Sequence, residues 1–379
     1  MSENRRAPKS GCCSSNNAPD KAPDYSPDAQ PHVAQPHVAQ SHVAQPHVAQ
    51  SQVYPASAAL SFRDYLGAWK ARWGIGRMAY AVEPGLYAMG DPSNESPVLV
   101  SANYKLTFDT LRKNLDGFNC WLLILDTKGI NVWCAAGKGT FGTDELVRRI
   151  TSSGLSGYVS HKRLILPQLG ATGVSAHEVA GRSGYQVLFG PVRSEDIKAY
   201  IGAGYKATKE MRTVKFTFSD RLVLTPMELI PALKYSLPVF GGMLLANRFA
   251  AKPFDRTDVA ANAGAIISGT VLTPALLPYI PGKAFSLKGW LMGFACTAGI
   301  LGLSGKFRKG SRLASAGSLL LYPALSSFLA MNFTGSSTYT SPSGVNKEMK
   351  KALPFIVGSA AAGAALTLGI HLFGRRKAK

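Results

Sequence analysis

The chain of 379 residues is 46% apolar and carries a formal net charge of +20 at pH 7. This length and apolar content suffice for more than one domain with a buried core. Many positive residues flank apolar stretches, as at residues 306–312 and 375–379, which is the pattern expected beside lipid headgroups. Because no nucleic-acid-binding motif accompanies the charge, we exclude nucleic acid as a partner.

The number and spacing of the cysteines argue against two kinds of site. The five cysteines are Cys12, Cys13, Cys120, Cys134 and Cys296. An odd count without framework spacing argues against a disulfide scaffold. An iron-sulfur cluster needs four clustered thiolates, so this chain can hold one only by recruiting the first two. The N-terminus has no apolar signal segment, so we expect no cleaved secretory signal and a cytoplasmic start for the first half.

Residues 1–58 form a polar segment rich in proline and alanine, with a five-residue repeat. The repeat carries His32, His37, His42 and His47. Frequent proline and few large apolar side chains cannot offset the entropy of ordering, so we predict a disordered, partly extended tail. Evenly spaced histidines can bind a metal weakly. A low-complexity repeat without a ligand is the simpler interpretation, and the same holds for the first two cysteines.

Residues 59–222 alternate between strand-like and helix-like segments. Runs rich in β-branched and apolar residues predict strands at 97–101, 120–126, 163–167, 185–191 and 213–218. Helices are predicted between them at 107–115, 143–153, 175–184 and 194–204. This order predicts a Rossmann-like α/β domain whose mainly parallel sheet is covered on both faces. Ligands are then expected at the carboxyl ends of the strands.

Residues 223–379 contain five apolar segments of about the length of a membrane-spanning helix. They lie at 229–249, 259–280, 289–305, 313–333 and 353–373. We therefore predict an all-α transmembrane domain of about five helices, although the first segment contains Lys234 and the third is short. Small residues at 358–366 favour close helix packing. Lysine and arginine are almost equally frequent on the two sides of these segments, so they do not decide the orientation.

The segment Asn131–Lys138, with the sequence NVWCAAGK, places Cys134 in the first turn of a predicted short helix. Asn131 is a suitable N-cap residue. The helix dipole, the free amides of the first turn and Lys138 favour a thiolate. The alanines and Gly137 are expected to leave a flat face that suits a large planar ligand. On this reasoning alone, Cys134 is a core cysteine, a ligand to a bound group or a nucleophile.

These eight residues resemble the signature of the mercury-methylation corrinoid protein family, with agreement at all eight positions. Residues 164–179 also resemble that family and the related large subunit of the corrinoid iron-sulfur protein. The order of an α/β domain and five membrane spans is similar as well. The resemblance therefore extends from about residue 60 to the C-terminus.

The resemblance implies that Cys134 is the lower axial ligand of a cobalt corrinoid of the cobalamin type. The cofactor contacts implied for this helix are Asn131, Val132, Trp133, Cys134, Ala135, Ala136, Gly137 and Lys138. A thiolate is a soft, strongly donating ligand, so it makes a methyl group on the opposite face of cobalt more carbanion-like. Trp133 either shields the ring or fills the core.

Six residues elsewhere are weaker candidates for contacts with the corrinoid. They are Ser101, Asn103, Thr107, Gly170, Gly173 and Ser175. The first three follow the first predicted strand and either hydrogen bond to the corrinoid edge or serve as turn and cap residues. The last three follow the third predicted strand, where glycine permits close approach of the backbone to the cofactor or its tail.

The activity implied by the resemblance is methyl transfer from methyl-Co(III) to inorganic Hg(II), which yields methylmercury. The methyl group comes from a folate-type donor. Because the chain lacks a four-cysteine cluster of its own, a separate ferredoxin with two 4Fe-4S clusters restores Co(I). The alternative is a membrane-anchored corrinoid methyl carrier with another acceptor, as in acetyl-CoA metabolism.

A membrane transport or scaffold protein with a ligand-binding α/β domain is a possibility of a different class. Ionisable residues inside the membrane would favour it. Under the corrinoid hypothesis, we expect a multi-pass protein of the inner, or cytoplasmic, membrane with the corrinoid domain in the cytoplasm.

Overall fold

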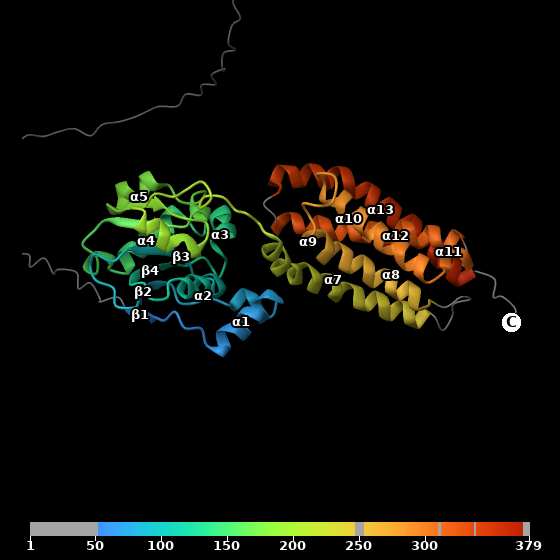
Figure 1. Cartoon of the computed structure of the whole chain (residues 1–379), viewed down its shortest axis with the longest axis horizontal. Helices are drawn as coiled ribbons and strands as arrows, with labels where there is room; N and C mark the ends of the chain where they lie inside the picture. The colour runs from blue at the N-terminus through green and yellow to red at the C-terminus, as the bar shows by residue number, and fades with distance from the viewer. Residues whose placement is uncertain (1–51, 247–253, 310–311, 337–338, 374–379) are drawn as a thin grey trace, which may run out of the picture. The chain divides into compact units, whose positions relative to one another are not determined.

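A computed structural model describes residues 52–246, 254–309, 312–336 and 339–373. The α/β domain is built on one six-stranded sheet (Figure 1). Its strands are β1 (Val53–Ala56), β2 (Gly85–Met89), β3 (Val98–Ala102), β4 (Cys120–Leu125), β5 (Arg163–Leu166) and β6 (Gln186–Phe189). Strands β4, β3, β5 and β6 are parallel and lie in this order, whereas β2 is antiparallel to β4 and parallel to β1. The sheet is therefore mixed, with the predicted parallel part at its centre and one edge.

Helices cover both faces of this sheet. They are α1 (Phe62–Arg72), α2 (Lys105–Asn114), α3 (Val132–Lys138), α4 (Thr143–Ser152), α5 (Ala176–Ser183) and α6 (Ile197–Gly202), with the 3-10 turns η1 (Arg77–Ala79), η2 (Leu155–Gly157), η3 (Gln168–Gly170) and η4 (Ser194–Asp196). Val100 of β3 belongs to a buried cluster with residues of α3, α4 and α5. Its neighbour Leu99 belongs to a second cluster, with residues of α2 and α6. Such alternation is expected of a strand that is buried on both faces.

Strand β1 corrects the boundary that we predicted for the N-terminal tail, because it lies inside the segment 1–58. The strand has four residues and pairs only with β2, at the edge of the sheet. Its Pro55 is tolerated there because an edge strand has one side without ladder hydrogen bonds. The histidine repeat and the first two cysteines lie outside the described residues.

The strand that we predicted at residues 213–218 does not form, and α7 begins at Phe218 instead. Phe216 has a positive φ of 46°, which a regular strand does not allow. Its buried ring lies 6.2 Å from that of Phe333, centroid to centroid. Packing against a distant aromatic ring thus overrides the local β-propensity of this segment.

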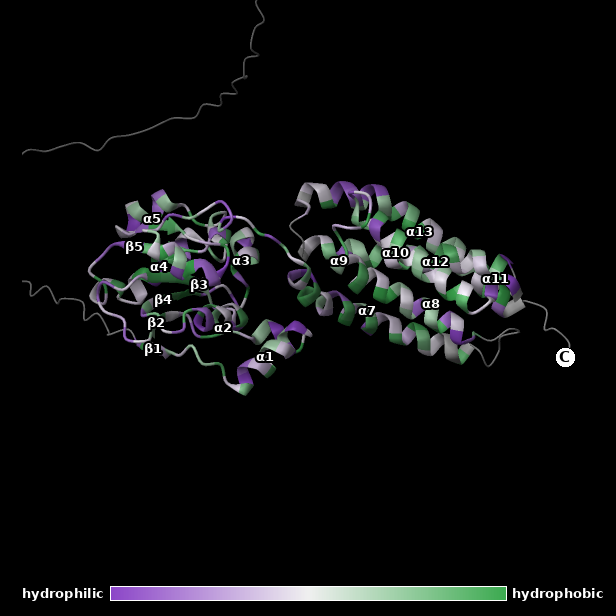
Figure 2. Cartoon of the chain, in the orientation of Figure 1, coloured by the Kyte–Doolittle hydropathy of each residue, from purple (hydrophilic) through white to green (hydrophobic). Residues whose placement is uncertain are grey.

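The C-terminal part of the chain is helical. Its elements are α7 (Phe218–Ala246), α8 (Arg256–Ile267), the π-helical turn η5 (Ser268–Leu272), α9 (Thr273–Ala275), α10 (Phe285–Leu303), α11 (Lys306–Lys309), α12 (Arg312–Asn332), the 3-10 turn η6 (Phe333–Ser336) and α13 (Pro342–Phe373). Figure 2 shows that hydrophobic residues predominate along α10, α12 and α13. Among the described residues, three helical segments are long and apolar enough to cross a membrane: Phe285–Leu303, Arg312–Gly335 and Ser343–His371.

The expectation of five spans is therefore not confirmed; three of the five expected segments coincide with helices that are long and apolar enough to cross a membrane. The segment expected at 259–280 lies in the consecutive helical elements α8, η5 and α9, and its middle widens to π geometry before Pro274. It is not among the three helical segments that are long and apolar enough to cross a membrane. The segment expected at 229–249 falls in α7, and its last three residues lie outside the described ranges.

Glycines allow the long helices to approach closely, as the small residues of the sequence predicted. A side chain at Gly363 of α13 would place its Cβ 2.5 Å from the backbone nitrogen of Leu321 in α12. A side chain at Gly289 of α10 would come within 2.7 Å of the backbone oxygen of Ser326. Close contact between α12 and its two neighbours therefore requires residues without a Cβ at these points.

Two ionisable residues inside the helical part were not singled out from the sequence. Lys288 is 8% exposed and donates hydrogen bonds to the backbone oxygens of Leu277 and Ile280, at 2.6 and 2.5 Å. Asp258 is 5% exposed, and its Oδ1 lies 2.9 Å from Lys306 Nζ. Both charges have partners within the helical part, so they hold helix ends together.

Candidate cofactor-binding site

Helix α3 begins as the sequence predicted. Asn131 has extended backbone angles, and its Oδ1 accepts a hydrogen bond from the backbone N–H of Cys134 at 2.9 Å. The helix ends at Gly139, whose φ of 80° is easily adopted only by glycine. Cys134 is exposed on the first turn. It is therefore not a buried core cysteine, which removes one of the three interpretations.

The two faces of α3 differ in a way that the sequence did not reveal. Val132, Ala135 and Ala136 are buried in the cluster that covers one side of the sheet. The alanines therefore pack against the core and do not form the flat surface that we expected beside the thiol. Gly137 lies one turn after Cys134, and a Cβ there would have no other atom within 4 Å. The open surface beside the thiol is therefore provided by Gly137.

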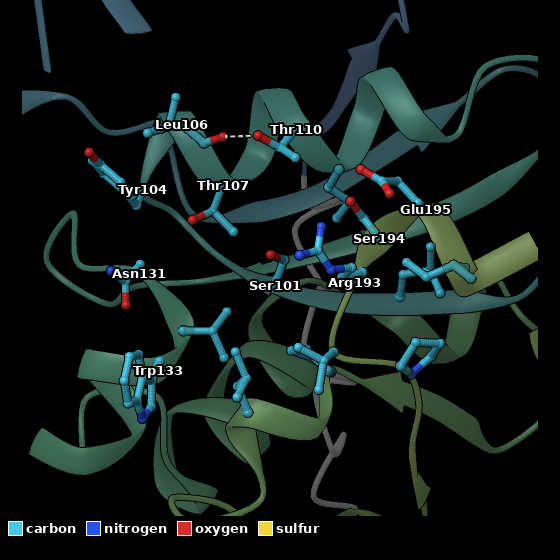
Figure 3. A pocket seen from close by; sticks show the side chains of 18 of the residues that line it. Ser101, Tyr104, Leu106, Thr107, Thr110, Asn131, Trp133, Arg193, Ser194 and Glu195 are labelled. Atoms are coloured by element: carbon cyan, nitrogen blue, oxygen red, sulfur yellow. Dashed lines mark hydrogen bonds between the residues drawn. The ribbon is translucent and has the colours of Figure 1, made fainter. Parts of the chain in front are cut away.

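A pocket of about 480 Å³ lies between α2 and α3, at the carboxyl ends of β3 and β5. Figure 3 shows Thr107 and Thr110 of α2 on one side and Asn131 and Trp133 on the other. Of the predicted site residues, it brings together Ser101, Thr107, Asn131, Val132 and Trp133. Cys134 follows Trp133 in the chain but is not among the lining residues. The side chain of Trp133 is 42% exposed, so it does not fill the core.

The side chain of Asn103 supports the loop before α3 and does not line the pocket. Its Oδ1 accepts hydrogen bonds from the backbone N–H groups of Thr127 and Gly129, at 3.1 and 3.0 Å. The hydroxyl of Thr127 lies 2.9 Å from the same oxygen. Asn103 is 5% exposed. It therefore fixes the turn that leads from β4 to the N-cap of α3.

Gly170, Gly173 and Ser175 are not among the residues that line the pocket. A Cβ at Gly173 would lie 2.2 Å from the backbone oxygen of Phe141 and 3.0 Å from Cα of Ala136. A Cβ at Gly170 would lie 2.6 Å from the ring of Phe141. Ser175 caps α5 by accepting a hydrogen bond from the N–H of Glu178. The two glycines therefore let their segment pack closely against Phe141 and against Ala136 of α3.

Residues at both ends of the pocket were missed in the sequence. Arg193, Ser194 and Glu195 lie at one end, after β6. The position of Arg193 is fixed by an ion pair with Asp220, in which Nη2 lies 2.6 Å from Oδ2. The available signal was that this loop follows the carboxyl end of a parallel strand, where ligands are expected.

The other end of the pocket includes Tyr104, Arg72 and Arg77. Arg72 ends α1 and Arg77 begins η1, so both come from a region before β2 that we did not recognise as structured. The guanidinium carbon of Arg77 lies 5.4 Å from the ring centroid of Tyr104, a cation–π contact. Tyr104 itself is only 3% exposed.

An ion-pair cluster holds α1, and with it Arg72, against α2. Asp64 of α1 contacts Lys105 Nζ at 2.6 Å and Arg112 Nη2 at 2.8 Å. Arg112 also pairs with Asp109, at 2.8 Å. Burial raises the pKa of Asp64, but hydrogen bonds from Lys105, Ser61 and Arg112 together lower it further, to well below the usual value. Asp64 is therefore a carboxylate at neutral pH.

The remaining thiols and histidines of the described residues do not form a metal site. No group of three or more His, Cys, Asp or Glu side chains that could hold a metal occurs there. Cys120 is buried in β4, where desolvation raises the pKa of its thiol to about 12. His177 is exposed on α5. Cys134 is thus the one exposed thiol of the described α/β domain.

Comparison with known proteins identifies relatives that match part of the chain. Residues 75–201 match the family model of the CO dehydrogenase/acetyl-CoA synthase delta subunit. The gamma subunit of the acetyl-CoA decarbonylase/synthase complex from Methanocaldococcus jannaschii is 32% identical over 127 residues, which cover 33% of this chain and 26% of that protein. Its counterpart from Archaeoglobus fulgidus is 34% identical over 127 residues, or 33% and 27% of the two chains. A gamma 2 subunit from Methanosarcina thermophila is 36% identical over 122 residues, or 31% and 26%.

The chain thus spans about a quarter of the length of these curated relatives. The segment that matches the family model runs from the turn before η1 to α6, and so contains α3, Cys134 and most of the residues that line the pocket. The C-terminal helices lie outside it. Residues 75–201 of this chain are therefore homologous to part of the subunits of CO dehydrogenase and acetyl-CoA synthase systems.

Proposed function

We propose that the α/β domain binds a cobalt corrinoid and carries a methyl group, while the C-terminal helices anchor it to a membrane. The observation that carries this proposal is the position of Cys134, which follows the pocket residue Trp133 in the chain. Its thiol is exposed, and its backbone N–H donates the N-cap hydrogen bond to Asn131. The relatives are subunits of complexes named for acetyl-CoA synthesis and decarbonylation. Chemistry of that kind transfers one-carbon groups, which a corrinoid can carry.

The residues present fit a corrinoid in three respects. The pocket lies at the carboxyl ends of parallel strands, where ligands bind in such sheets. Gly137 leaves open space one turn from the thiol, so a flat macrocycle can approach α3. The hydroxyl of Tyr104 and Nε of Arg72 are buried at the pocket without a hydrogen-bond partner in the described residues. A ligand with polar groups at its edge would satisfy them.

A bound corrinoid supplies a cobalt centre that accepts and releases a methyl group. The Cys134 sulfur would be a ligand that holds the cobalt, and Asn131 would keep Cys134 in place through its N-cap bond. Ser101 and Thr107 would hydrogen bond to the ring edge. Asn103 acts indirectly, because its oxygen is occupied in holding the loop before α3.

The relatives favour a methyl acceptor of one-carbon or acetyl metabolism. Hg(II) is a second candidate acceptor, and one observation favours it: the segment NVWCAAGK carries an exposed thiol, that of Cys134. A thiolate donates strongly to a soft metal, which suits transfer of a carbanion-like methyl group to a soft electrophile. The methyl donor would be of folate type in both cases.

Electrons for such a cycle would come from a separate protein, and we propose a ferredoxin with two 4Fe-4S clusters. Support comes from the described cysteines, which are three residues in separate elements and do not form a cluster site. We also propose that the α/β domain lies on the cytoplasmic side of the inner membrane, where low-potential reductant is available. The three apolar helices support membrane attachment.

Absorbance spectroscopy of the full chain, purified in detergent and incubated with cobalamin, tests the proposal. We expect bound corrinoid in the wild type and a changed spectrum with weaker binding in Cys134→Ala. Cys296→Ser, which alters a thiol in α10, is the matched control and should bind as the wild type does. Wild-type protein without corrinoid bands would refute the corrinoid function.

Methyl-transfer assays then separate the two acceptors. The loaded protein receives a methyl donor, a two-cluster ferredoxin and either Hg(II) or the acetyl-CoA-forming partner enzyme. Methylmercury that forms with the wild type and not with Cys134→Ala would support Hg(II). Transfer only to the partner enzyme would support the one-carbon function.

A further inference from the structure

Two arginines at the pocket differ from the other arginines of the α/β domain. Five arginines of this domain are buried or half-buried. Arg112, Arg149 and Arg193 each form an ion pair with a carboxylate. Arg72 and Arg77 have no ion pair among the described residues, although both line the pocket. An anion bound beside these two guanidinium groups would supply the counter-charge that the other three arginines obtain from carboxylates.

Two polar atoms beside these arginines also lack a partner. Tyr104 Oη and Arg72 Nε are shielded from solvent, and neither has a hydrogen-bond partner in the described part of the chain. Burial raises the pKa of Tyr104 more than Arg77 and Arg72 lower it, so the hydroxyl keeps its proton. Both atoms can therefore donate a hydrogen bond, and a single oxygen-rich acceptor would satisfy them together.

The acidic residue that lines the pocket lies at its other end. Figure 3 shows Glu195 beside Arg193, far along the pocket from Tyr104. Asp64 is the carboxylate of α1 nearest in sequence to Arg72, but it is committed to Lys105 and Arg112. The Tyr104 end of the pocket is therefore cationic, and the ion pairs of Asp64 hold α1, which carries Arg72, in place.

We propose that Arg72, Arg77 and the hydroxyl of Tyr104 form an oxyanion site that holds a phosphate or carboxylate group of a ligand in this pocket. Guanidinium groups suit such anions because their donors match two oxygens at once. This inference rests on the proposed function. Two ligands of the proposed function carry a suitable anionic group. Cobalamin has the phosphodiester of its nucleotide loop, and a folate methyl donor has glutamate carboxylates.

Binding of cobalamin and of cobinamide, which lacks the nucleotide loop and its phosphate, tests the site and its anion. The full chain in detergent is titrated with each corrinoid and followed by absorbance. We expect Arg77→Gln to weaken cobalamin binding about tenfold or more and to leave cobinamide binding unchanged. Arg77→Lys, which keeps the charge, should recover part of the affinity.

Arg63→Gln is the matched control, because it removes the same charge from an exposed position of α1 that does not line the pocket. It should bind both corrinoids as the wild type does.

If Arg77→Gln leaves both affinities unchanged but raises the KM for methyltetrahydrofolate about tenfold, the anion is the carboxylate of the donor. If neither quantity changes in correctly folded Arg77→Gln, the oxyanion site is refuted while the corrinoid function stands.

Failure of the corrinoid function is distinguishable from failure of this site. If wild-type protein binds neither corrinoid, pyrophosphate alone serves as the probe. An increase in thermal stability of the wild type with pyrophosphate, absent in Arg77→Gln and present in Arg63→Gln, would still support an oxyanion site. Equal responses of the three proteins would refute it.

Discussion

Asn131 and Cys134 are joined by a hydrogen bond of 2.9 Å from the backbone N–H of the cysteine to the side-chain oxygen of the asparagine. The residue that begins α3 thus fixes the backbone of the residue that carries the thiol. The helix has only seven residues, too few to be stable through its own propensity. The position of the Cys134 sulfur therefore depends on this cap and on the buried face of α3.

Removal of the cap should loosen α3. We expect Asn131→Ala to destabilise the helix by about 1 kcal/mol, so that amides of residues 132–138 exchange about fivefold faster with solvent. Asn131→Asp keeps an acceptor oxygen and should retain the slower exchange. Hydrogen-exchange mass spectrometry of the full chain measures both variants. Identical exchange in the two variants would show that the cap does not stabilise the helix.

The close packing of Gly173 against Phe141 and Ala136 should make this position intolerant of a side chain. In Gly173→Ala the new Cβ would meet backbone atoms of Phe141 and Ala136 at 2.2 and 3.0 Å. Because backbone cannot rotate away as a side chain does, we expect a loss of about 1–3 kcal/mol. Gly181→Ala is the control, since a Cβ there has open space. Thermal denaturation should show a lower midpoint for the first variant and no decrease for the second.

Asn103 should stabilise the loop that precedes α3. Asn103→Ala leaves the N–H groups of Thr127 and Gly129 without their acceptor, which costs about 2 kcal/mol. We expect faster hydrogen exchange at residues 126–130 and, as a consequence, weaker corrinoid binding. Thr107→Ala changes a pocket-lining hydroxyl on α2 and should leave exchange in that loop unchanged. If Asn103→Ala exchanges like wild type there, the supporting role is wrong.

The ion pairs of Asp64 should make the stability of α1 depend on pH. The pKa of Asp64 is lower in the folded protein than its ordinary value, about 3.9. Such a carboxylate adds stability above its ordinary pKa, and this contribution is lost as the pH falls toward the folded-state pKa. We therefore expect the protection factors of α1 amides to be constant near neutrality and to fall below about pH 4.

Asp64→Asn should remove this dependence. Because Asp64 keeps some contact with solvent, screening limits the effect to about 1 kcal/mol, or about a fivefold lower protection of α1 at pH 7. The difference between variant and wild type should shrink below about pH 4. Asp91→Asn, an exposed carboxylate without an ion pair in the described residues, is the control. A difference that persists at low pH would contradict the role of Asp64.

Interactions between neighbours in the chain were predictable from the sequence. The N-cap of α3 depends on residues three positions apart, and the strands β3 to β6 depend on short apolar runs. The lengths of α10, α12 and α13 follow from long apolar segments, which is why three of the five expected segments form helices long and apolar enough to cross a membrane. The edge strand β1 and its neighbour β2 were missed because strands of four and five residues carry little pattern of their own.

What the sequence by itself determined is therefore an α/β domain with a capped thiol at the start of a short helix, followed by apolar helices. The tertiary structure alone decided that Arg72 and Arg77 meet Tyr104, and that the alanines of α3 face the core. The physical reason is that these contacts join segments far apart in the chain. Their positions are set by the order of strands in the sheet and by the ion pairs of Asp64, which no local periodicity records.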